Sequence, residues 1–100
     1  MNVQITSRKF KAHDSLKDFI NKQVQSMEKF SDDILETNVI LSFTHLKDSI
    51  KTAEVVTKVP GKVISVTESS DDFHKSAAIA VDKTIRQLKK VKTKRIASKR

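Results

Sequence analysis

Positively charged side chains are the residues of this chain whose number and spacing could do chemistry. From Lys83 to Arg100 the sequence contains nine Lys or Arg and no acid, whereas the 82 residues before them carry eleven Lys or Arg against twelve Asp or Glu. A nearly neutral body therefore carries a concentrated basic end, within a chain of net charge +8. Charge gathered in this way is typical of proteins that bind a polyanion.

The sequence offers little to catalysis or metal binding. His13, His45 and His74 have no HxH or HxxxH spacing, and the chain contains no Cys. The acidic pairs at 32–33 and 71–72 flank expected helix ends, where turn and cap roles explain them. One Gly cannot build a glycine-rich phosphate loop, and there is no GxSxG nucleophile motif. We therefore expect a non-enzyme without metal, cofactor or small-molecule substrate.

Length and composition indicate one small domain. One hundred residues, of which 37% are hydrophobic, suffice for a single core. The absence of Cys excludes a disulfide scaffold, and neither a signal peptide nor a membrane-spanning segment is visible. We expect a cytoplasmic protein that does not associate with a membrane.

Apolar residues at every second position predict four strands. The first covers residues 2–8, the second 36–45 and the third 51–59. Pro60-Gly61, the only Pro and the only Gly, predict a tight reversal over 59–62, after which a fourth strand covers 63–67.

Apolar residues at helical spacing predict two helices. The first begins at Asp14 or Ser15 and ends before 31–33. The second is capped within 69–72, begins near Phe73 and loses its periodicity after about Lys92. We therefore divide the chain into a domain over 1–93 and a mobile basic tail over 94–100.

The order of these elements defines the expected fold class. The sequence is β-α-β-β-β-α, which is typical of an α+β fold. Three consecutive strands suit an antiparallel meander, and both amphipathic helices need a surface to cover. We predict a four-stranded sheet with two helices on one face.

The second helix carries the strongest functional signal. At about 100° per residue its apolar side chains share one face, and its basic side chains lie opposite, between about 160° and 280° from Phe73. Most of them are Lys, which contacts phosphate as a mobile point charge, so the contacts should position a ligand rather than read its sequence. This predicted binding face consists of Lys75, Lys83, Arg86, Lys89 and Lys90.

The first helix adds a smaller basic contribution. Lys22 and Lys29 lie on its outer side, with Asp18 between them in angle. An ordinary solvated face of mixed charge explains the two lysines equally well, and Lys29 also complements the dipole at the helix end. Both readings stay open at this point.

Aromatic residues argue against recognition by base stacking. The chain has no Trp or Tyr, and Phe19, Phe30, Phe43 and Phe73 fall at expected core positions. Phe10 is either a core contact at a strand end or a stacking platform. Recognition by shape and backbone charge is the better hypothesis.

Several segments resemble the ribosome hibernation promoting factor family, also called ribosome-associated translation inhibitors or sigma-54 modulation proteins. The most specific match is Lys83-x-x-Arg86-Gln87-Leu88-x-Lys90, where the family has a KLxRQLxK-like helix. The opening Val3-x-Ile5-Thr6-Ser7, the segment Met27-Glu28-Lys29-Phe30 and the turn Val59-Pro60-Gly61 are similar to family positions as well. The resemblance extends from residue 2 to about residue 92.

The resemblance implies a double-stranded-RNA-binding-like fold that binds the small ribosomal subunit and its rRNA. There the family occupies the decoding region, competes with mRNA and tRNA, and inhibits translation in starved or stationary cells. Carried over by position, the RNA contacts fall on Lys29, Lys83, Arg86 and Lys90, with Lys89 beside them. The length of the chain is that of a short family form, and the resemblance leaves open whether it promotes ribosome dimers.

Two other function classes fit the same sequence. A general RNA- or DNA-binding module would use the same helix face, whereas a module that binds an acidic protein or an anionic membrane would use the basic tail. The folded helix face is the feature that separates these alternatives.

Overall fold

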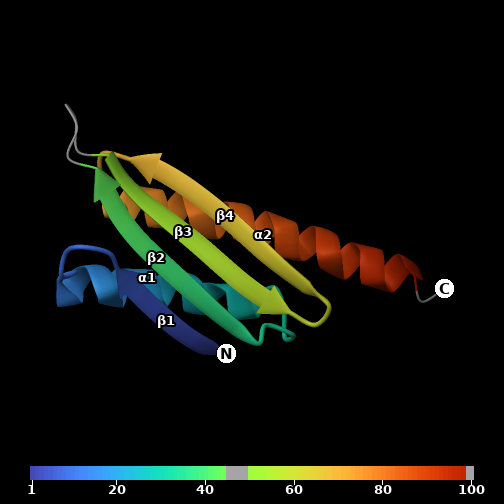
Figure 1. Cartoon of the computed structure of the whole chain (residues 1–100). Coiled ribbons are helices and arrows are strands. Elements are labelled where there is room, and N and C mark those ends of the chain that lie inside the picture. The colour runs from blue at the N-terminus through green and yellow to red at the C-terminus, as the bar shows by residue number, and fades with distance from the viewer. Residues whose placement is uncertain (45–49, 99–100) are drawn as a thin grey trace.

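The architecture agrees with the predicted α+β order. The computed structural model describes residues 1–44 and 50–98, and its helices and strands follow one another as β-α-β-β-β-α (Figure 1). The elements are β1 (Asn2–Ser7), α1 (Asp14–Gln25), the short 3-10 helix η1 (Ser26–Lys29), β2 (Glu36–Thr44), β3 (Ile50–Val59), β4 (Lys62–Ser70) and α2 (Phe73–Ser98).

The four strands form one sheet in their order along the chain, β1-β2-β3-β4. β1 pairs with β2 in parallel, because the chain returns across the sheet through α1 before β2 begins. β2, β3 and β4 form the expected antiparallel meander. Gly61 adopts a φ of 78° in the link between β3 and β4, which only Gly adopts without strain, so the predicted reversal at Pro60-Gly61 is confirmed.

Both helices cover the same face of the sheet, as predicted (Figure 1). α2 lies against β3 and β4 and alongside α1. Beneath the helices an apolar row crosses all four strands in register, formed by Ile5, Val39, Val55 and Val66. The position of each helix is therefore fixed by the strand residues that share this parity.

The opposite face of the sheet carries the other parity. Gln4, Asn38, Val56 and Ser65 form one of its rows, and no helix of the described residues covers it. Its charged side chains among the described strand residues are Glu36, Glu54 and Lys58, and the Lys58 ammonium lies 2.8 Å from a Glu36 carboxylate oxygen. We call this nearly neutral surface the open sheet face.

The core contains the apolar face of each helix. Leu16, Ile20 and Val24 of α1 are buried, and α2 contributes Phe73, Ala77, Ala80, Val81 and Leu88. Thr84, a polar residue on the predicted apolar face, is fully buried, and its hydroxyl donates to the Ala80 carbonyl at 2.7 Å. That bond satisfies the hydroxyl inside the core.

Three element boundaries differ from those predicted. The end of the first helix is a 3-10 turn, η1, and β4 continues to Ser70 rather than ending at 67. α2 continues to Ser98 rather than ending near Lys92, because Lys, Arg and Ala are good helix formers even without apolar periodicity. The predicted mobility of 94–100 stays a prediction. His45, the expected last residue of the second strand, lies outside the described residues, as do 99–100.

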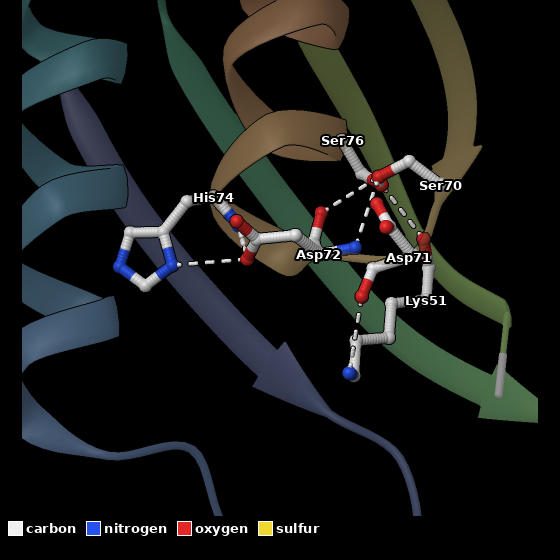
Figure 2. Close-up of polar contacts among 6 residues, drawn as sticks. All are labelled: Lys51, Ser70, Asp71, Asp72, His74 and Ser76. Carbon is white, nitrogen blue, oxygen red and sulfur yellow. Dashed lines mark hydrogen bonds and ion pairs between the residues drawn. The ribbon is translucent and has the colours of Figure 1, made fainter.

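A network of polar side chains joins β3, β4 and the beginning of α2 (Figure 2). The Ser76 hydroxyl donates to the Lys51 carbonyl at 2.7 Å and shares a 2.6 Å hydrogen bond with the Ser70 hydroxyl. The Lys51 ammonium donates to the Asp71 carbonyl at 3.2 Å. These contacts fix the point from which α2 crosses the sheet.

Asp72 caps α2. The His74 backbone amide donates to Asp72 Oδ1 at 3.0 Å, and this hydrogen bond is the main reason why the pKa of the Asp72 carboxyl lies below its ordinary value of 3.8. The cap was predicted within 69–72, and the structure identifies the residue.

We expect the stabilisation from the Asp72 cap to depend on pH. Because the pKa is lower in the folded state, the carboxylate stabilises the fold above 3.8, and this contribution disappears as the pH falls through the folded value. Thermal unfolding of D72A should therefore differ most from wild type at neutral pH and least under acid conditions. D71A, which removes a neighbouring carboxylate outside the cap, is the control. An unchanged difference across this pH range would contradict an ionic cap.

Candidate nucleic-acid interface

The basic residues predicted on α2 are all exposed. Lys75, Arg86 and Lys90 lie on the side of the helix opposite its buried row, which contains Ala80 and Leu88. The sheet therefore orients these side chains by burying the residues between them. The arrangement presents positive charge outward along α2, as the helical spacing predicts.

Two members of the predicted face already have acidic partners. Arg86 lies 3.1 Å from Asp82, one turn earlier in α2, and both side chains are largely exposed. Lys83 forms an ion pair with Glu68 of β4. Lys83 thus leans from the helix toward the edge of the sheet, where it links α2 to β4.

Glu68 is a residue that the sequence reasoning missed. It shares the strand parity of Ile64 and Val66, which face the helices, and its side chain is only 21% exposed. An acid at an inward position of an amphipathic strand is a signal that it has a partner in the layer above. That signal could have identified a link to a basic residue of α2.

The lysines predicted on the first helix lie at its C-terminal end. Lys22 of α1 and Lys29 of η1 line an open hollow of about 500 Å³ together with Gln25, Ser26 and Glu28. The hollow contains two cations, one anion and neutral hydrogen-bonding groups. It can accept a phosphate group through lysine contacts and hydrogen bonds.

Two aromatic contacts join the helices along the seam between them. The Phe19 ring of α1 lies 4.8 Å from the His74 ring of α2, centroid to centroid. About four turns farther along α2, the Lys89 ammonium lies over the Phe30 ring, 4.7 Å from its centroid. Phe30 follows Phe19 in the chain, and its partner Lys89 follows His74. The two helical segments therefore run in the same direction. The second contact brings Lys29 and Lys89 to the same end of the seam.

The phenylalanines agree with their predicted positions except for Phe30. Phe73 is buried, and Phe19 and Phe43 are half-buried against the core. Phe30 is also half-buried, but it is not among the side chains packed against the core. The core prediction for Phe30 was wrong, because the ring lies beyond the last apolar turn of the helix and contacts α2 instead.

Phe10 packs as a core contact. Its ring is stacked on Phe73 with centroids 5.0 Å apart and meets Phe43 edge-on at 5.1 Å. Since Phe73 occupies one face of the ring, the geometry favours the strand-end reading over a stacking platform. The three rings line one side of a hollow of about 300 Å³ near the start of α1.

The histidines and acids that the structure describes do not gather into a metal site. Among the described residues, no group of three or more His, Cys, Asp or Glu side chains could hold a metal ion. The same residues include no helix long and apolar enough to span a bilayer. His45 lies outside the described residues.

Comparison with known sequences shows the family of this chain. Residues 3–96 match the profile described as Sigma 54 modulation protein / S30EA ribosomal protein. The chain belongs to this family. A curated S30EA relative, the ribosome hibernation promoting factor of Azotobacter vinelandii, is 28% identical over 96 residues, which cover 96% of this chain and 87% of the relative. The resemblance predicted from the sequence is confirmed.

Solved structures of similar proteins share the fold. The N-terminal domain of Thermus thermophilus Protein Y is 25% identical with a TM-score of 0.81, covering 91% of this chain and 99% of that domain. A ribosomal subunit interface protein from Coxiella burnetii is 25% identical with a TM-score of 0.84, covering 93% and 99%. Together with the S30EA family match, these relatives identify a ribosome-associated hibernation or modulation factor.

Proposed function

We propose that this protein binds the small ribosomal subunit through its two helices and inhibits translation by occupying the decoding region. The observation that carries the proposal is the exposed basic face of α2 on an S30EA fold. The binding residues are Lys75, Lys83, Arg86, Lys89 and Lys90 of α2, with Lys22 and Lys29 at the C-terminal end of the first helical segment.

The action we propose is occupancy of rRNA rather than catalysis. Lysines and one arginine on a rigid helix contact phosphates without reading bases, so the shape of the rRNA would decide where the protein docks. A protein in the decoding region excludes mRNA and the anticodon stem of tRNA. This would take place in the cytoplasm during starvation or stationary phase, as part of a stress response, and promotion of ribosome dimers is a separate property to be measured.

A sucrose-gradient experiment tests the proposal. The purified protein is mixed with bacterial small subunits carrying labelled initiator tRNA and mRNA, and each fraction is assayed for protein and label. We expect the protein to sediment with the subunit while the tRNA label leaves it. Equal binding to small subunits, large subunits and unrelated duplex RNA would instead indicate a general nucleic-acid-binding module.

Asp82 should weaken rRNA binding in the wild-type protein. Its carboxylate lies 3.1 Å from the Arg86 guanidinium, so a phosphate must compete with it for that cation. An exposed pair of this kind contributes about 0.3 to 0.5 kcal/mol, and D82N should therefore lower the Kd for small subunits by about twofold. E54Q removes one negative charge from the open sheet face and serves as the control. Equal tightening by both variants would mean that only the net charge matters.

A further inference from the structure

The contact between Phe30 and Lys89 lies outside the buried core. The phenyl ring is half-buried, yet it is absent from the side chains packed against the buried cluster. The Lys89 ammonium lies 4.7 Å from the ring centroid, within the range of a cation-π interaction. A large apolar side chain at the edge of the fold is thus placed against a cation of α2.

This contact lies where the two groups of lysines approach each other. Lys29 is the neighbour of Phe30 in the chain and lines the hollow beside η1. Lys89 lies on the α1 side of the exposed face of α2, as its contact with Phe30 requires. Phe30 therefore connects the basic end of η1 with the basic face of α2.

We propose that Phe30 is a positioning residue of the binding surface, which holds Lys89 over its ring so that one RNA backbone contacts both helices across the C-terminal end of the seam. The inference rests on the proposed function and adds the direction in which the RNA lies. A lysine has several rotatable bonds, and binding a phosphate requires that it adopt one arrangement. A ring that already restricts the side chain lowers the entropy lost on binding.

The chain provides a matched control for this role. Phe19 also joins the two helical segments, but its ring contacts His74 rather than a lysine. F19L and F30L each remove one aromatic contact from the seam while keeping an apolar side chain. F30Y retains the aromatic face and should restore what F30L loses.

The experiment measures the Kd for purified bacterial small subunits, together with thermal unfolding of each variant. We expect F30L to raise the Kd by about two- to fivefold, with F30Y and F19L close to wild type at a temperature where all are folded. F30L should have no further effect in a K89A background, because the ring then has no ammonium to hold. In the free protein, NMR should show ring-current shifts of the Lys89 methylene protons that disappear in F30L.

Two outcomes distinguish this inference from the proposed function. If wild type fails to bind small subunits, the proposed function is wrong and the inference falls with it. If wild type binds and F30L binds equally well, or if F30L lowers affinity as much in K89A as in wild type, the positioning role of Phe30 alone is overturned. An effect of F19L as large as that of F30L would also overturn it, since helix packing would then explain both.

Discussion

Replacing Arg86 and Lys90 by Ala should weaken binding to small ribosomal subunits by about tenfold or more while leaving the fold intact. The two side chains are exposed on α2 and belong to the most specific segment of the family resemblance. If the five basic residues of the α2 face contact phosphates, they alone should make log affinity fall with log salt at a slope of about −4 to −5, and the double variant should reduce that slope by about two. The thermal midpoint should change by less than about 3 °C, because the Arg86–Asp82 pair is exposed.

The open sheet face provides the control for this double variant. Lys58 lies on that face and Arg8 follows the end of β1, so R8A/K58A removes the same charge from residues outside both helices. The control should lower affinity only through net charge and to a much smaller extent. Retained co-sedimentation of R86A/K90A, or an equal loss in both variants, would exclude the α2 face as the binding surface.

Within the segment from Lys83 to Lys90, Leu88→Ala should cause the largest loss of stability. Leu88 is 2% exposed and anchors α2 to the core between the exposed residues Gln87 and Lys89. Truncating a buried Leu costs about 2 to 5 kcal/mol, which corresponds to a fall of roughly 10 °C or more in the thermal midpoint of a domain of this size.

Q87A is the matched control for L88A, because it removes a neighbouring side chain that lies outside the core. Its free energy of unfolding by urea should stay within about 0.5 kcal/mol of wild type. If L88A cost less than about 1 kcal/mol, α2 would not be held to the sheet by its apolar row. R86A/K90A and L88A together separate the residues that bind from the residue that positions them.

Period-two and helical spacing predicted the elements because each pattern reports which side chains one strand or helix buries. Val39 of β2 and Val55 of β3 are buried at positions whose chain neighbours point to the other face of the sheet. Ala80 and Leu88 are buried on one side of α2. The parallel pairing of β1 with β2 was not predicted, since it depends on the path of the chain over the sheet. Local patterns contain no information on that path beyond the length of the connection.

Contacts between elements were the part of the site that could not be predicted. Glu68 meets Lys83, and Phe30 meets Lys89, only because the core places β4 and the end of the first helical segment beside α2. The number of residues between the two members of each pair does not predict that they meet. The end of α2 was missed for a different reason, because the helix continues to Ser98 on residues of good intrinsic helix propensity after its apolar periodicity ends.

The open sheet face has a consequence for the way in which the protein approaches a ribosome. With exposed lysines on the helices and nearly balanced charge on the strands, the molecule is an electric dipole whose positive end is its helical side. In the field of a polyanion such a dipole rotates before contact, so most encounters begin with the helices in front. The protein then needs little reorientation after collision. Its association rate constant should decrease steeply with added salt, while its dissociation rate constant should respond less.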